Sequence, residues 1–234
     1  MRAALAVDLD HEAAAFAGTT DALLRAVLPA VVTEVRALRS GDQVLVHPGN
    51  STKPAKVPVL IRGDHHADLL VWFRCVPDSS GGYLAVADSR FQLESTLMRE
   101  PLLRLDYTRD MHTAPASHWQ MHAERGAFSH LLAHAGAGAP HDLASLHLPV
   151  GGPRGRPCLE DFLQFLVQEC KVDALPGWRT AVEQGRERWR RLQAAVFVRD
   201  APSEAVRVLT DLGYGVEPPT EGTRPDDTEA LRRW

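Results

Sequence analysis

Histidines are concentrated in one part of the chain. Seven of the eleven histidines fall within residues 102–152, and Arg104, Asp106 and Glu124 lie among them. Imidazole exchanges protons near neutral pH and binds metal ions in its neutral form. Carboxylates can orient an imidazole, and a guanidinium holds anions. This segment is therefore the strongest candidate for a functional site. Its histidines are His112, His118, His122, His130, His134, His141 and His147.

Two stretches of this segment alternate between apolar and polar residues, a pattern typical of half-buried β-strands. If residues 102–108 and 117–124 pair with their apolar sides inward, their polar side chains share the open face of a sheet. A further short strand is expected at 145–149. The side chains expected on the open face are Arg104, Asp106, Thr108, His118, Gln120, His122 and Glu124.

Roles follow from the chemistry of these groups. His118 and His122 are candidates for general acid and base, with Glu124 or Asp106 orienting them and Arg104 stabilising developing negative charge. The strand at 145–149 would add His147 to the candidate site. The alternative interpretation is a solvated sheet face that carries ordinary cross-strand polar pairs.

The spacing of these residues favours metal binding less than it favours acid–base chemistry. His118 and His122 would lie about 13 Å apart on a straight strand, which is too far to share one ion. His130 and His134 are spaced like the ligands of a metal-binding helix, but the glutamate that follows the first histidine in such helices is missing. Ordinary helix-surface histidines are the favoured interpretation, and no metal site or cofactor is assigned.

A second candidate lies in the Gly-, Pro- and Arg-rich stretch 150–157, before a helix that is predicted to begin near Cys158. Free backbone N–H groups and a helix N-terminus favour anions. Arg154 and Arg156 are therefore candidates for contacting a phosphate group. The Gly-Lys-Ser/Thr of a nucleotide-binding P-loop is absent. The alternative is a flexible connector, the usual role of such clusters.

Composition limits the classes of function. The chain has 234 residues, 44% of them hydrophobic, and a formal net charge of −4, so any binding to nucleic acid would need a local basic patch. Three widely spaced cysteines predict neither a disulfide framework nor a thiolate zinc site. The first thirty residues include four acidic ones, which disfavours a signal peptide, and no apolar run approaches the ~18 residues of a membrane span. A cytoplasmic protein without membrane attachment is expected.

The order of the patterns predicts an α+β fold in a single domain over residues 1–216. Apolar residues at helical spacing predict an N-terminal helix at 19–39, kinked at Pro29. Hairpin-like spacing predicts a central antiparallel sheet of about six strands within 43–149, with one turn at residues 63–66. Residues 158–213 predict a group of about three helices, and the polar segment 217–234 is expected to be a mobile tail.

Three short motifs resemble the TumE-like toxins of bacterial toxin–antitoxin systems. They are Leu103-Arg104-Leu105-Asp106-Tyr107, His118-Trp119-Gln120-Met121-His122 and Leu146-His147-Leu148-Pro149. In those toxins a strand with an Arg-x-Asp/Glu core precedes His-rich strands. The resemblance covers about a fifth of the chain, which is longer and has additional helices at both ends. The Arg- and Ala-rich composition suits an actinobacterial protein.

The resemblance implies a nucleic-acid-directed or growth-inhibiting activity at the matching positions Arg104, Asp106, His118, His122 and His147. Together with the residues themselves, it favours a hydrolase or nuclease-like enzyme acting on a phosphate-bearing substrate such as RNA. The competing hypothesis is a non-catalytic module that recognises a small molecule or a protein partner, a second copy of the chain included, through the same face.

Overall fold

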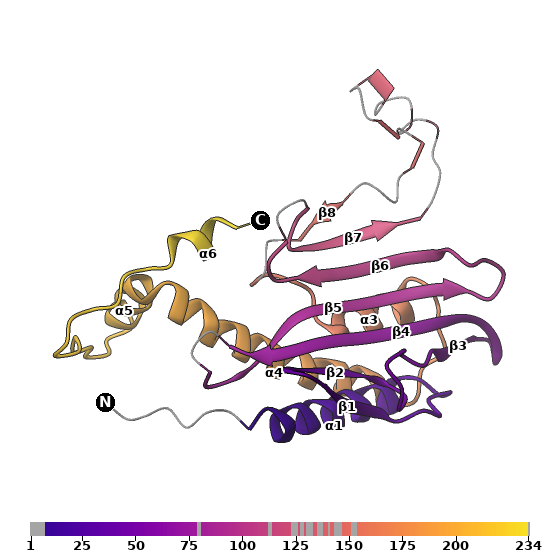
Figure 1. Cartoon of the computed structure of the whole chain (residues 1–234), viewed down its shortest axis with the longest axis horizontal. Helices are drawn as coiled ribbons and strands as arrows, with labels where there is room; N and C mark the ends of the chain where they lie inside the picture. The colour runs from indigo at the N-terminus through magenta and orange to yellow at the C-terminus, as the bar shows by residue number, and fades with distance from the viewer. Residues whose placement is uncertain are drawn as a thin grey trace.

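The computed structural model describes residues 8–78, 81–111, 114–122, 126, 129, 133–134, 138–139, 141–142, 147–150 and 154–233. Within them, helices lie at both ends of the chain and strands lie between (Figure 1). The strands are β1 (Val35–Ser40), β2 (Gln43–Pro48), β3 (Val57–Ile61), β4 (Asp64–Pro77), β5 (Leu84–Ser95), β6 (Pro101–Thr108), β7 (Ser117–Met121) and β8 (Leu148–Pro149). The helices are α1 (Leu9–Val27), α3 (Leu159–Gln168), α4 (Trp178–Asp200), α5 (Pro202–Asp211) and α6 (Thr228–Arg232).

The eight strands form one antiparallel sheet in the order β1-β2-β4-β5-β6-β7-β8, with β3 paired to the same strand, β4, that β2 pairs with. α3 and α4 lie behind the sheet in the view of Figure 1, so the face toward the viewer is the open one. This arrangement confirms the predicted α+β fold with a central antiparallel sheet. It has eight strands in the described part of the chain, where the sequence predicts about six.

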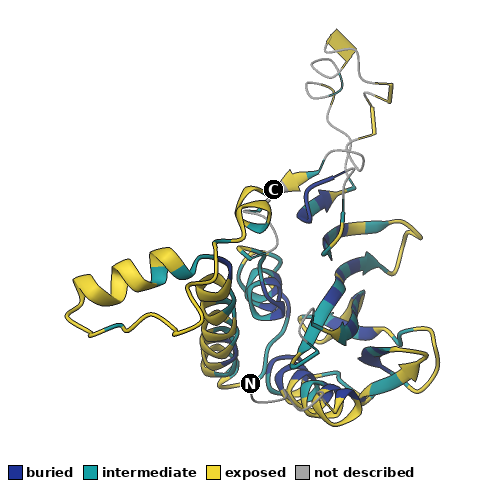
Figure 2. Ribbon diagram, turned by 60° about the vertical axis from the view of Figure 1, so that its left-hand side comes forward, coloured by how far each residue is buried: buried dark blue, intermediate teal, exposed yellow. Residues whose placement is uncertain are grey.

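The core lies between the helices and one face of the sheet, where a line of aromatic rings connects the two layers. Phe16 of α1 contacts Phe73 of β4, with ring centroids 4.9 Å apart, and Phe73 contacts Phe91 of β5 at 5.4 Å. Phe162 of α3 packs between Phe91, at 5.9 Å, and Trp119 of β7, at 5.5 Å. Apolar residues at every second strand position therefore face the helices, and their polar neighbours face the other way. In the ribbon of Figure 2, the segments coloured as buried lie where the helices and the sheet face each other.

The N-terminal helix differs from the predicted span of 19–39. α1 ends at Val27, its cap Leu28 has an extended conformation, and Val35 begins strand β1. Pro29 ends the helix instead of kinking it, because a residue before proline is disfavoured in the helical region and proline has no N–H to donate. The prediction was wrong here because the apolar residues after Pro29 match the spacing of a helix as well as that of a strand.

The predicted turn at 63–66 is also shorter than expected. Arg62 and Gly63 have positive φ angles of 57° and 86° and form the turn, while Asp64 already begins β4. Two positive φ angles in succession are typical of the tight turns that match the twist of a hairpin. The carboxylate of Asp173 accepts hydrogen bonds from the backbone N–H groups of Arg62 and Gly63, at 3.0 and 2.7 Å.

The predicted helical region is present as α3, α4 and α5. The segment 217–234, expected to be a mobile tail, contains the short helix α6 and contacts the rest of the chain. The Asp227 N–H donates to the Asp200 carbonyl at 2.7 Å, and Arg233 donates to the Arg109 carbonyl at 3.2 Å. The tail therefore returns to the turn that follows β6.

Candidate functional site

Polar side chains from neighbouring strands meet on the open face of the sheet. In the antiparallel register, Asp106 of β6 lies opposite Arg90 of β5 on one side and opposite His118 of β7 on the other. Arg104 lies opposite Gln120 of β7. Directly opposite residues have their Cβ atoms about 4.5–5.5 Å apart and point to the same face. We call these five residues together with His147 the polar sheet face.

The structure thus places Arg104, Asp106 and His118 together, as the two-residue alternation predicts. Asp106 is buried, and its carboxylate accepts a hydrogen bond from Nε of Arg90 at 2.8 Å. Nε of Arg104 lies 3.6 Å from the other carboxylate oxygen. Because two guanidinium groups share one carboxylate, one positive charge in this trio is left without a counter-charge.

His118 is held in one tautomer. Its side chain is buried, and its Nδ1 lies 2.8 Å from the carbonyl oxygen of Pro115. A carbonyl only accepts hydrogen bonds, so Nδ1 carries the proton and Nε2 has the lone pair. Nε2 has no hydrogen-bond partner within the described part of the chain. In the neutral ring, Nε2 is therefore the nitrogen that can accept a proton.

Gln120 connects Arg104 to His147. The Gln120 side-chain oxygen accepts from Arg104, and its amide nitrogen lies 2.9 Å from Nε2 of His147. An amide nitrogen only donates, so Nε2 of His147 is the acceptor and Nδ1 carries the proton. The His147 and His118 rings meet edge to face, with centroids 4.5 Å apart. Two imidazoles and an amide are thus ordered beside the arginines.

The surroundings of His147 favour its neutral form. Burial lowers the pKa of His147, and the neighbouring His118 and Arg104 lower it further, while Asp106 acts in the opposite direction. A histidine whose pKa is lower in the folded protein than in the unfolded chain stabilises the fold above its ordinary pKa of about 6.5. That stabilisation is lost as the pH falls from about 6.5 through the lowered folded-state pKa.

We therefore expect the wild-type protein to lose more stability than His147→Gln between pH 8 and pH 5. Glutamine retains an acceptor for Gln120 and does not titrate in this range. Thermal unfolding of both proteins across that range measures the difference. Parallel stability curves for the two proteins would contradict the environment described for His147.

His122 and Glu124 are not part of the contacts described so far. His122 follows the end of β7, its backbone N–H donates to the Leu102 carbonyl at 3.1 Å, and its buried Nε2 has no hydrogen-bond partner among the described residues. Glu124 lies outside the described residues, as do His112 and His130. The strand predicted at 117–124 ends at Met121. The acid–base role of His122 therefore stays a prediction.

Arg154 and Arg156, the predicted phosphate contacts, interact with protein groups instead. Arg154 forms an ion pair with Asp200 of α4, with Nε 2.7 Å from the carboxylate. The Arg156 guanidinium lies 3.8 Å from the ring centroid of Tyr107 and 4.6 Å from that of Trp189. Burial lowers the pKa of Arg156 to about 10. The structure brings neither arginine to the polar sheet face, and both attach the segment before α3 to α4.

The N-terminus of α3 has its own protein cap. The Asp161 carboxylate accepts a hydrogen bond from the Cys158 backbone N–H at 3.1 Å, and the Cys158 thiol lies 3.3 Å from the same oxygen. Burial raises the pKa of the Cys158 thiol, and the neighbouring Glu160 and Asp161 raise it further. Because a thiolate is the nucleophilic form, Cys158 has the environment of a structural cysteine.

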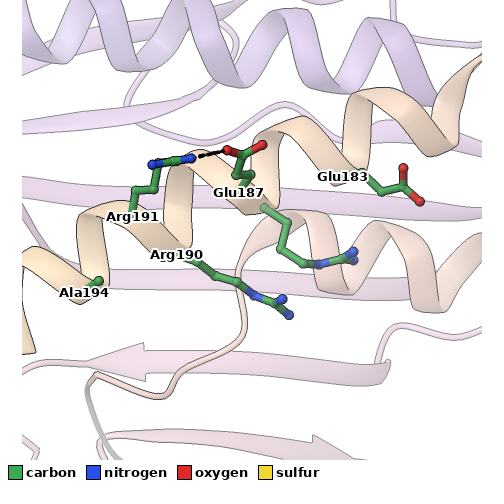
Figure 3. Close-up of a pocket in the computed structure, with 6 residues that line it drawn as sticks. Glu183, Glu187, Arg190, Arg191 and Ala194 are labelled. Atoms are coloured by element: carbon green, nitrogen blue, oxygen red, sulfur yellow. Dashed lines mark hydrogen bonds and ion pairs between the residues drawn. The ribbon is translucent and has the colours of Figure 1, made fainter. Parts of the chain in front are cut away.

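A hollow on the exposed side of α4 has only charged groups and one alanine around it (Figure 3). Glu187 and Arg191 form an ion pair of 2.7 Å on successive turns of the helix. Both side chains are exposed, so this is the solvated helix surface expected from charge pairs at this spacing. The hollow is lined by Glu183, Arg186, Glu187, Arg190, Arg191 and Ala194, all from one helix.

Sequence reasoning did not select Arg90, Gln120 or Trp72 as site residues. Trp72 lies opposite Arg90 in the β4–β5 register, between Val71 and Phe73, which face the core. The signal for Trp72 is its position between the buried apolar residues Val71 and Phe73, and Arg90 lies between the buried residues Ser89 and Phe91. The pairing order of the strands is also needed to bring them next to Asp106.

No family model matches the chain, and no curated protein or solved structure gives a significant match. None of the described helices has the length and apolar character needed to cross a membrane. Across the described ranges, no three His, Cys, Asp or Glu side chains gather in a way that could hold a metal ion.

Proposed function

We propose that the polar sheet face binds a phosphate-bearing ligand, with RNA as the leading class of ligand. The observation that carries this proposal is the trio of Arg90, Arg104 and Asp106, in which two guanidinium groups share one carboxylate. The planar fork of an arginine fits the oxygens of a phosphate group.

The neighbouring groups suit the same ligand. His147 carries its proton on Nδ1, so its ring can donate a hydrogen bond to a phosphate oxygen. The chain as a whole has a net charge of −4, so a polyanion would be attracted by this local patch rather than by the protein as a whole. Binding of this kind weakens as the salt concentration rises.

Arg90→Gln tests the proposal. The Arg90 side chain is 46% exposed, so a ligand can reach it without displacing the core. One charge-assisted hydrogen bond contributes about 1.5–3 kcal/mol, so the variant is expected to bind a fluorescent RNA oligonucleotide at least roughly tenfold more weakly in an anisotropy titration. The dependence of affinity on salt should also become shallower.

Arg36→Gln is the matched control, because it removes the same charge. Arg36 is an exposed arginine of β1 that forms an ion pair with Glu34. This variant is expected to bind RNA like the wild type. Equal weakening by both variants, or the absence of saturable binding to RNA, mononucleotides and inorganic phosphate by the wild type, would contradict the proposal.

A second candidate function is hydrolysis of the bound phosphoester. The observation that favours it is the fixed tautomer of His118, which leaves a basic nitrogen next to the arginines. Such a nitrogen can remove a proton from an attacking hydroxyl or water, while the arginines stabilise the developing charge. The bond from phosphorus to the leaving oxygen then breaks, and that oxygen takes up a proton from solvent water. The carboxylate of Asp106 contacts the arginines rather than an imidazole, so this base would act without an orienting carboxylate among the described residues. Turnover of a bound ligand separates this candidate from binding alone.

A further inference from the structure

We propose that the ligand is a single-stranded nucleic acid, and that one of its bases stacks on the indole of Trp72. This inference rests on the phosphate-binding function proposed above and specifies its substrate class. It depends on the position, the exposure and the contacts of Trp72.

The strand register places Trp72 in line with the polar sheet face. Trp72 lies opposite Arg90, Arg90 lies opposite Asp106, and Asp106 lies opposite His118. These four residues form a row across β4, β5, β6 and β7. Three spacings between neighbouring strands make the row about 14 Å long. An indole and two arginine-bearing strands are therefore within reach of one short stretch of ligand.

Unlike Trp119, Trp72 does not stack on an aromatic ring of any described residue. Trp119 points to the opposite face of the sheet and stacks on Phe162, with ring centroids 5.5 Å apart and ring planes 10° apart. Trp72 is partly exposed and makes no ring–ring or guanidinium–ring contact with any described residue. Its flanking residues Val71 and Phe73 are buried against the helices, so the indole lies on the open face.

The chemistry of this row fits a nucleotide better than a simple anion. A base stacked on an aromatic side chain contributes about 1–3 kcal/mol, whatever the base, because every base has a π-face. Arg90 lies opposite Trp72 on the neighbouring strand, and its 46% exposed side chain can contact the phosphate of the same or the next nucleotide. In a duplex the bases are stacked on one another and cannot reach an indole on a sheet, so the geometry favours a single strand.

Trp72→Leu tests the inference with three probes: an eight-nucleotide single-stranded RNA, an RNA duplex of the same sequence, and inorganic polyphosphate. We expect the variant to bind the single strand roughly 5- to 150-fold more weakly, the equivalent of one lost stacking interaction. Binding of polyphosphate should not change, because it has no base. Trp72→Phe, which retains an aromatic face, should restore most of the affinity for the single strand.

Circular dichroism and thermal melting of each variant establish that it is folded before binding is measured. Tight binding of the duplex by the wild type, or equal weakening of the single strand and polyphosphate in Trp72→Leu, would overturn the stacking role of Trp72. If Trp72→Leu binds all three probes like the wild type, the stacking inference is wrong while the phosphate site remains. If the wild type binds none of the probes, the proposed function itself is wrong and this inference is overturned with it.

Discussion

Replacing Phe162 by alanine is expected to lower the free energy of unfolding by about 3–5 kcal/mol, the usual cost of truncating a buried aromatic side chain. Phe162 is fully buried. It packs against Phe91 of β5 and Trp119 of β7, so it connects α3 to two strands that are separated by β6. The cavity left by the ring would remove contacts from both strands, because the surrounding backbone can close it only in part.

Chemical denaturation of the wild type and of Phe162→Ala measures this loss. Phe197→Ala is the matched control, since Phe197 lies on α4 with 45% of its surface exposed and undergoes the same chemical change. Exposed substitutions of this kind usually change stability by no more than about 0.5 kcal/mol. A comparable loss of stability in both variants would show that the aromatic line through Phe162 is not the centre of the core.

If the protein hydrolyses its ligand, His118→Asn is expected to lower the turnover rate by about 10²- to 10⁴-fold, the usual contribution of a general acid or base. The asparagine side-chain nitrogen can occupy the place of Nδ1 and still donate to the Pro115 carbonyl, which His118 contacts at 2.8 Å. The variant lacks the basic Nε2. Its affinity for RNA should therefore remain within a few-fold of the wild type while cleavage is lost.

Cleavage of an end-labelled RNA oligonucleotide by the wild type and the variant measures this effect. His65→Asn is the control, because it removes an exposed imidazole of β4 that has a carboxylate partner, Asp68, at 2.8 Å and lies outside the polar sheet face. Equal cleavage by wild type and His118→Asn, or equal loss in the control, would contradict the role of His118. If the wild type binds RNA but never cleaves it, hydrolysis is rejected and the proposed binding function is retained.

Ligand binding and hydrolysis are assigned to different residues of the same part of the sheet. The arginines and Trp72 account for affinity, whereas His118 accounts for chemistry. Arg90→Gln and Trp72→Leu should therefore change the dissociation constant, and His118→Asn should change the rate at saturating ligand. This separation makes it possible to reject catalysis without rejecting recognition.

The sequence by itself determined which residues share a face within each strand. Two-residue alternation is a local property, so it placed Arg104 and Asp106 on the side opposite Leu105, and His118 on the side opposite Trp119. It also determined the α+β order, because the change from alternation to helical spacing near Cys158 can be read along the chain. The resemblance to TumE-like toxins remains a prediction that these observations do not test.

Only the tertiary structure decided which strands are neighbours and therefore which side chains meet. Arg90 and Trp72 reach Asp106 because β4, β5 and β6 pair in one particular register, and alternation carries no information about register between strands. His147 reaches Gln120 only because the chain returns to the edge of the sheet 27 residues later. The helix predicted at 19–39 failed for a related reason: the apolar spacing after Pro29 suits both a helix and a strand, and pairing of β1 with β2 selected the strand.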